Sequence, residues 1–244
     1  MCTFVILRRP KHPWPVIIGA NRDEMKDRAW QPPARHWPDR PELTAGLDVL
    51  GDGTWLGLND WGVVAGVLNR MGTLGPASGK RSRGELPLEA LDHAEVREAA
   101  KALTELEPAS YRPFNLVIAD PIEAVLVICD GETVWHEDIP EGLSMITARG
   151  LNAADSPRTA RYRPLFDAAM PPDPETDAWQ EWADLLASTA FDQDAGPHGA
   201  MHITTDSGFE TVSSSLIALP AHGRVGISPK WMFAAADGTF QPVV

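Results

Sequence analysis

Short runs of apolar residues alternate with polar breaks along most of the chain, a pattern that predicts many strands and few helices. The first two runs, residues 2–9 and 15–22, are rich in β-branched residues and flank a Pro-rich corner, so they predict a hairpin. Residue numbers that face one another in an antiparallel pair sum to a constant. A corner centred on His12 makes that sum about 24, which places Cys2 opposite Arg22 to within one residue.

The rest of the chain divides into predicted elements by the same patterns. Helical spacing begins after Ser82, a candidate N-cap with Glu85 in the capping-box position, and breaks near His93. Two further stretches, 25–43 and 143–157, show no regular period and predict irregular structure. The predicted strands are 53–69 (a hairpin), 113–119, 123–129, 132–136, 200–205, 210–219, 224–228 and 231–236, and the predicted helices are 82–106, 157–169 and 176–190.

This order of elements lacks the strict strand–helix alternation of a parallel sheet, so it favours an α+β sandwich. The 244 residues could form one large domain or two small ones. Because no linker or internal repeat is evident, we expect a single domain over 1–244. The sequence indicates no oligomeric state.

Composition excludes several classes of protein. Hydrophobic residues make up 43% and charged residues 23%, as in globular proteins. The formal net charge of −13 predicts repulsion from nucleic acid and from anionic membranes. No apolar run is long enough for membrane insertion and no secretory signal precedes the first strand, so we expect a cytoplasmic protein. The two cysteines give no disulfide framework, and Cys129 is expected to be a buried apolar residue.

Several motifs along the chain resemble one known family. The Met1-Cys2 start and Asn21-Arg22-Asp23-Glu24 resemble the NRDE family, also called the transport and Golgi organisation 2-like family. Later blocks resemble it in the same order: Gly53–Asn59, Gly62–Asn69, Ser82–Leu86, Phe114–Val117 and Thr211–Leu216. The family's start in turn resembles N-terminal-nucleophile hydrolases of the cholylglycine-hydrolase type. This resemblance implies a four-layer αββα sandwich.

Cys2 is the candidate nucleophile. If Met1 is removed, Cys2 also carries the free α-amino group, which titrates at about 7.7–8.0 and can accept the thiol proton. A free thiol has a pKa of about 8.5, and a neighbouring guanidinium such as that of Arg22 would lower it. The resemblance implies that Arg22 and Asp23 both contribute. Side chains alternate along a strand, so both can reach Cys2 only if a bend or bulge intervenes.

The resemblance also implies an oxyanion donor after the second hairpin, which is Asn69. Asn152 is a second candidate amide, although its setting is more typical of turn capping. One residue departs from the family pattern: Val212 stands where the late block commonly carries arginine. If that arginine holds an anionic substrate in relatives, this chain lacks the contact, so the substrate class does not carry over.

Two patterns that suggest other chemistry are incomplete. His198 and His202 have the spacing of a helical metal pair but lack its glutamate, and Gly199 disfavours a helix, so we expect metal independence and no cofactor. The Gly- and Lys-containing segment 70–82 lacks the spacing of a phosphate-binding loop and is read as a mobile surface loop.

Three functions remain open at this stage. The first is an N-terminal cysteine hydrolase that cleaves a C–N bond in a small non-peptide amide. The second is a non-catalytic carrier on the same scaffold, because relatives have been linked to haem trafficking and to lipid or acyl-CoA handling; the sequence has no Cys-Pro dipeptide. The third is an interaction module. The first two share one fold and predict a small-molecule partner, and the residues near Cys2 favour the hydrolase.

Overall fold

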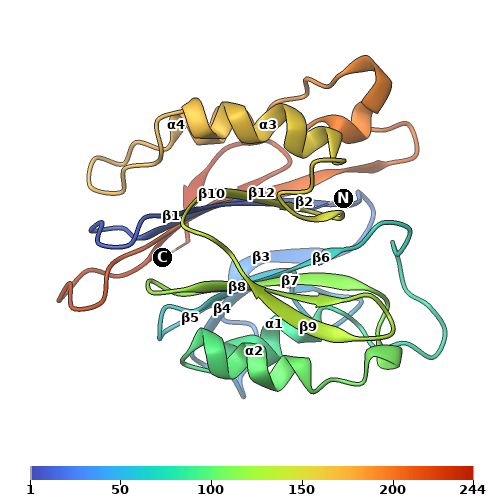
Figure 1. Ribbon diagram of the computed structural model, residues 1–244, viewed down its shortest axis with the longest axis horizontal. Helices are drawn as coiled ribbons and strands as arrows, with labels where there is room; N and C mark the ends of the chain where they lie inside the picture. Colours follow the sequence, from blue (N-terminus) through green and yellow to red (C-terminus); the bar gives the residue numbers. More distant parts are fainter. Residues whose placement is uncertain (1, 244) are drawn as a thin grey trace. The chain divides into compact units, whose positions relative to one another are not determined.

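The computed structural model describes residues 2–243, which form two compact units. One unit contains the chain up to Asp27 together with the part from Pro140 onward, and the other contains Arg28–Ile139. Each unit has one seven-stranded antiparallel sheet, and its α-helices lie on one face of that sheet (Figure 1). No helix within the described residues is long and apolar enough to cross a membrane.

The first unit is built on the N-terminal hairpin. Its strand order is β11-β10-β1-β2-β12-β13-β14, with α3 and α4 on one face (Figure 1). The bounds are β1 Thr3–Arg8, β2 Val16–Met25, β10 Gly142–Thr147, β11 Gly150–Leu151, α3 Pro157–Ala168, α4 Gln180–Leu186, β12 Phe209–Leu219, β13 Lys230–Ala235 and β14 Gln241–Pro242, with short 3-10 turns η2 Gln193–Ala195 and η3 Pro197–Gly199.

The hairpin register agrees with the sequence prediction. Thr3 pairs with Asn21 and Phe4 with Ala20, so the paired numbers sum to 24. β2 lies between β1 and β12, and its residues from Val16 to Asp23 are buried. A strand buried on both faces needs the near-continuous apolar run that the sequence shows at its start.

Several predicted bounds in this unit were wrong. The stretch 143–157 is not irregular, because β10 pairs with β1 along residues 142–146, and the polar side chains of Ser144 and Thr147 are buried there. The predicted strands at 200–205 and 224–228 are absent as named strands, and the helix expected over 176–190 is confined to α4. Helix α3 matches its prediction: Ser156 caps it by accepting a hydrogen bond from the Thr159 N–H, and Pro157 occupies the first turn.

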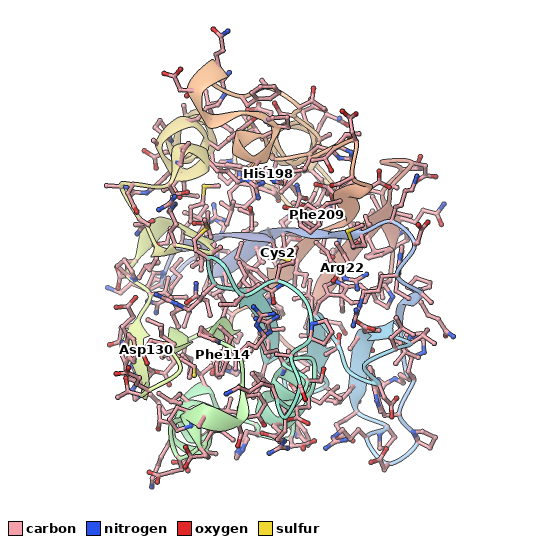
Figure 2. All side chains as sticks on the ribbon, turned by 90° about the vertical axis from the view of Figure 1, so that its right-hand side faces the viewer. Cys2, Arg22, Phe114, Asp130, His198 and Phe209 are labelled. Carbon is pink, nitrogen blue, oxygen red and sulfur yellow. The ribbon has the colours of Figure 1, made fainter. Side chains whose placement is uncertain are left out.

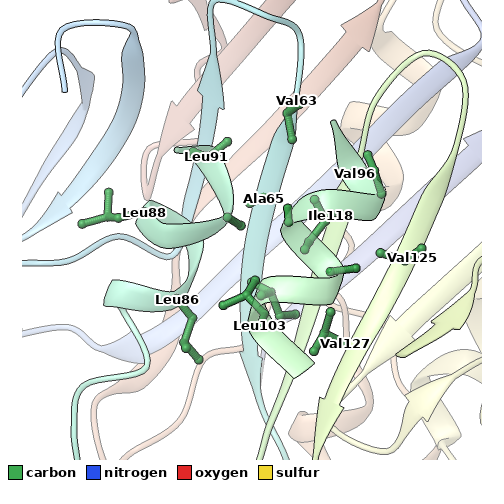
Figure 3. Packing of buried hydrophobic residues seen from close by; sticks show 14 of the residues in the cluster. Val63, Ala65, Leu86, Leu88, Leu91, Val96, Leu103, Ile118, Val125 and Val127 are labelled. Carbon is green, nitrogen blue, oxygen red and sulfur yellow. The ribbon is translucent and has the colours of Figure 1, made fainter. Parts of the chain in front are cut away.

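The second unit has the strand order β3-β4-β5-β6-β7-β8-β9, with α1 and α2 on one face (Figure 1). Branched and small apolar residues from the two helices pack onto β6, β7 and β8 to form its core (Figure 3). The bounds are β3 Trp30–Ala34, β4 Leu43–Asp48, β5 Leu56–Asn59, β6 Val64–Asn69, α1 Glu85–Leu91, α2 Val96–Thr104, η1 Pro108–Ser110, β7 Phe114–Ala119, β8 Ala124–Cys129 and β9 Val134–Asp138.

Two predictions in this unit need correction. The stretch 25–43 contains β3, which tolerates its prolines because it is an edge strand with a register shift between Gln31 and Ala34. Ser82 does not cap α1, whose N-cap is Gly84; the Glu85 carboxylate instead accepts a hydrogen bond from the Tyr111 hydroxyl at 2.5 Å. The predicted break near His93 is confirmed, since α1 ends at Leu91 and α2 begins at Val96.

Candidate active site

Cys2 lies at the start of β1, one position before the first pair of the hairpin. Continuing the register beyond Thr3–Asn21 places Cys2 opposite Arg22, as the sequence predicted (Figure 2). The residue is half-buried, and its Sγ lies 3.8 Å from the main-chain oxygen of Asp23. The thiol is therefore next to the polar end of β2.

The side chains of β2 alternate between the two faces of the sheet at this end. Asn21 and Asp23 point to the helix-bearing face: the Asn21 amide donates to the Leu186 and Met201 carbonyls at 2.9 and 3.0 Å. Arg22 falls on the opposite face and is 5% exposed. Cys2 thus shares a face with Arg22 by pleat, and its hydrogen-bonding distance to Asp23 is to the main chain rather than the carboxylate.

The irregularity that the sequence required is present, but on the neighbouring strand. Thr211 pairs with Asp23 while Ser213 pairs with Arg22, so Val212 is the extra residue of a β-bulge in β12. Val212 is buried. Bulges bend a strand and increase its twist, and they are common beside active sites. β2 itself keeps regular pairing with β1 up to Asn21.

The Asp23 carboxylate is buried and held from two sides. Its Oδ1 accepts a hydrogen bond from the Thr211 hydroxyl at 2.6 Å, and its Oδ2 lies 3.2 Å from Arg158 Nη1. Arg158 Nη1 also donates to Thr3 Oγ1 at 2.5 Å, and its Nη2 donates to the His198 carbonyl at 3.0 Å. Arg158 was missed by the sequence analysis, because a basic residue in the first turn of a helix resembles an ordinary solvated charge.

The electrostatic setting of Cys2 differs from the expectation. Burial and the Asp23 carboxylate raise the pKa of the Cys2 thiol, and the lowering effect of Arg22 is smaller than either. Arg22 lowers the pKa of the thiol, as the sequence predicted, but desolvation and the Asp23 carboxylate outweigh it, so the net shift is upward. Burial also lowers the pKa of His198, so this imidazole is neutral at pH 7.

The two candidate asparagines have different surroundings. Asn69 is the last residue of β6, where it pairs with Phe114 and is half-buried, and it belongs to the second unit. Asn152 has φ of 48°; its Oδ1 accepts from the Met145 N–H at 2.9 Å and its Nδ2 donates to Ser144 Oγ at 3.2 Å. These bonds match the turn-capping interpretation of Asn152.

The other motifs noted in the sequence are explained by their local structure and contacts. His198 lies in the 3-10 turn η3 rather than on an α-helix, and its ring centroid is 6.0 Å from that of Phe209 (Figure 2). Residues 2–243 contain no group of three or more His, Cys, Asp or Glu side chains placed to hold a metal ion. In the segment 70–82, carbonyl oxygens accept hydrogen bonds from Arg112 and Arg83. Cys129 is buried, as predicted.

Several solved structures that share the fold are described as hydrolases or amidases. A cysteine-to-alanine mutant of a conjugated bile acid hydrolase from Clostridium perfringens has a TM-score of 0.63 at 14% identity, covering 100% of this chain and 92% of its own. An arginine-to-leucine variant of that hydrolase has a TM-score of 0.60 at 13% identity, covering 99% of this chain and 92% of its own. A Caenorhabditis elegans orthologue of N-acylethanolamine-hydrolyzing acid amidase has a TM-score of 0.54 at 13% identity, covering 88% of this chain and 92% of its own.

These likenesses confirm the predicted fold class, an α+β sandwich of the N-terminal-nucleophile-hydrolase type. At such low identity they establish the fold alone. No curated protein is significantly similar to the chain in sequence. The motif order noted in the sequence has a direct counterpart, however, because the profile of the Transport and Golgi organisation 2 family matches residues 1–228. That match spans nearly the whole chain, and the protein therefore belongs to the Transport and Golgi organisation 2 family.

Proposed function

We propose that this protein is an N-terminal cysteine hydrolase that cleaves the C–N bond of a small, non-peptide amide through Cys2. The observation that carries the proposal is the placement of the Cys2 thiol at the start of β1, 3.8 Å from the Asp23 carbonyl, beside a buried carboxylate held by Thr211 and Arg158. The fold shared with an acid amidase and a bile acid hydrolase supports it.

The proposed reaction begins with removal of Met1, which frees the α-amino group of Cys2. That amino group accepts the thiol proton, and the thiolate attacks the amide carbonyl to form a tetrahedral oxyanion. When the C–N bond breaks, the protonated amino group gives its proton to the leaving amine and an acyl-thioester remains. A water molecule, deprotonated by the same amino group, attacks the thioester and releases the carboxylic acid and the free thiol.

The remaining site residues have supporting roles in this proposal. Arg22 shares the face of the sheet on which Cys2 lies and favours the thiolate, and Asp23 orients the α-amino group. Asn69 donates a hydrogen bond to the oxyanion. The role of Asn69 rests on the family resemblance. Asn69→Ala tests it, because loss of one oxyanion donor costs about 10²–10³-fold in turnover.

The raised pKa of the thiol is consistent with such a mechanism. A partly buried thiol beside a carboxylate stays protonated at pH 7, so it needs a nearby base at the moment of attack. An α-amino group on the same residue supplies that base without a second side chain. Retention of Met1 would place the amino group one residue away from the thiol, so we expect the unprocessed chain to be inactive.

The test combines intact-mass measurement with an amide panel. The purified protein should lack the mass of Met1, and it should hydrolyse at least one N-acyl amide, N-acyl amino acid conjugate or small linear amide. Cys2→Ala should abolish turnover while circular dichroism stays unchanged, and Cys129→Ser, which alters the other cysteine, should retain it. Hydrolysis that persists in Cys2→Ala would refute the nucleophile assignment.

One observation favours the alternative, a non-catalytic carrier of haem, lipid or acyl-CoA. Burial and Asp23 keep the pKa of the Cys2 thiol above its ordinary value, whereas a resting nucleophile commonly has a lowered one. Titration with haem, and separately with an acyl-CoA, distinguishes the two functions. Saturable stoichiometric binding that Cys2→Ala weakens, without hydrolysis of any amide in the panel, would place the carrier first.

A further inference from the structure

The side chain of Arg158 connects four separate segments of the first unit. It extends from the first turn of α3 and is 5% exposed. Its guanidinium donates to Thr3 Oγ1 on β1 and to the His198 carbonyl in η3, and it pairs with the Asp23 carboxylate on β2. These partners are between 40 and 155 residues away in the chain.

A charge buried to this degree destabilises the fold unless its ion pairs and hydrogen bonds compensate for the lost hydration. Moving a guanidinium out of water costs several kcal/mol, and replacing both members of a buried ion pair by apolar side chains of similar volume often gives equal or greater stability. The Asp23 side chain, its partner, is fully buried. The ion pair is thus weak evidence for stabilisation, and its location is more informative than its energy.

Arg158 contacts two residues that adjoin Cys2, Thr3 and Asp23. Thr3 follows Cys2 in the chain, and the main-chain oxygen of Asp23 is 3.8 Å from the Cys2 sulfur. Arg158 therefore holds both the residue after the thiol and the residue whose carbonyl contacts it. The same guanidinium lies next to the carboxylate whose charge acts against the thiolate.

We propose that Arg158 is a positioning residue of the Cys2 site: it fixes Thr3 and Asp23 around the thiol and offsets the Asp23 charge. Its effect on turnover rests on the proposed hydrolase function, but its effect on the reactivity of Cys2 does not. The charges that act on the pKa of the thiol are those of Arg22 and Asp23 on β2 and of the chain's α-amino group. Arg158 on α3 and the neutral His198 imidazole in η3 lie on the other side of Asp23, with Arg158 paired to its carboxylate.

The test measures alkylation of Cys2 by iodoacetamide as a function of pH, followed by peptide mass spectrometry on the full chain. Arg158→Met leaves the Asp23 charge without this guanidinium. We expect the pH profile of Cys2 alkylation to move up by about one unit, which is an about tenfold lower rate at pH 7. Arg158→Lys, which keeps the charge, should recover most of the wild-type rate.

A matched control is available one turn further along α3. Arg161 also pairs with an aspartate, Asp192 at 2.5 Å, but its side chain is 32% exposed. Arg161→Met should leave the alkylation profile unchanged. If Arg158→Met fails to fold, Arg158→Met with Asp23→Asn removes both buried charges, and the double variant should react with a profile close to that of wild type.

The outcomes separate this proposal from the hydrolase function. A wild-type profile in folded Arg158→Met, with only a lower melting temperature, would show that Arg158 is merely structural and would overturn the inference. A double variant whose profile stays shifted would overturn the electrostatic part. If Arg158→Met shifts the profile while no amide is hydrolysed by wild type, the positioning role stands and the hydrolase function fails.

Discussion

Replacing Thr211 by valine tests the hydrogen bonds that hold the Asp23 carboxylate. Valine has nearly the same shape as threonine but lacks the hydroxyl, which donates to Asp23 Oδ1 at 2.6 Å and accepts from the Ile203 N–H at 2.8 Å. Thr211 is 1% exposed, so water cannot readily replace either bond. The substitution leaves a buried carboxylate oxygen and a buried N–H each with one bond fewer.

The expected loss follows from these two bonds. A hydrogen bond to a charged group contributes about 1.5–3 kcal/mol, and a buried N–H that loses its partner costs about 1–3 kcal/mol. We therefore expect Thr211→Val to lower the free energy of unfolding by about 2.5–6 kcal/mol. Thr211→Ser keeps the hydroxyl and removes one methyl group, so it should cost only about 1 kcal/mol.

Urea unfolding followed by tryptophan fluorescence and far-UV circular dichroism measures both variants against wild type. A second pair in the Asp23→Asn background asks whether the charge of the acceptor matters: there, Thr211→Val should cost about 1–2 kcal/mol less than in wild type. Equal unfolding midpoints for Thr211→Val and Thr211→Ser would refute the reasoning, because the hydroxyl would then contribute nothing at this site.

Two further predictions follow from the same structure. Alkylation of Cys2 should still accelerate above about pH 9.5, where an ordinary thiol with a pKa of about 8.5 is already about 90% ionised, because burial and Asp23 raise its pKa; a plateau reached by about pH 9.5 would contradict this. Gly53→Ala should destabilise the chain by about 1–3 kcal/mol, because the new Cβ would lie 2.5 Å from the Gly84 backbone, as measured by thermal unfolding. In the control Gly51→Ala, the new Cβ comes no closer than 3.2 Å to any neighbour, the Ser82 hydroxyl oxygen, so this variant should be near neutral; equal losses would refute the clash.

The hairpin that places Cys2 could be predicted because its information is local. Apolar β-branched runs on both sides of a short Pro-rich corner determine the strands, and the centre of the corner determines which residues face each other. The observed pairing of Thr3 with Asn21 follows from those features alone. The break between α1 and α2 could be predicted for the same reason, because the sequence features that indicate it are also local.

The partners of Asp23 could not be predicted because they are distant in sequence. Thr211 is 188 residues away and Arg158 is 135 residues away. The hydrophobic pattern of the sequence does not show that a basic residue near a helix start is buried. The pKa direction of Cys2 was missed for the same reason, since the sequence shows that Arg22 is near but not how far the thiol is removed from water. Strand β10 was missed because its inner positions include Ser144 and Thr147.

The bulge at Val212 links these observations to the one departure from the family pattern. If the register of Ser213 with Arg22 continued without the extra residue, Val212 rather than Thr211 would face Asp23, and the carboxylate would lose its hydroxyl partner. The bulge therefore lets Thr211 reach Asp23 while Ser213 stays opposite Arg22. Val212 itself is 4% exposed, in a region that already contains the buried guanidinium groups of Arg22 and Arg158. An arginine at this position would bring a third cation out of water at a cost of several kcal/mol unless it met its own anion, so valine leaves the Asp23 charge to Arg158.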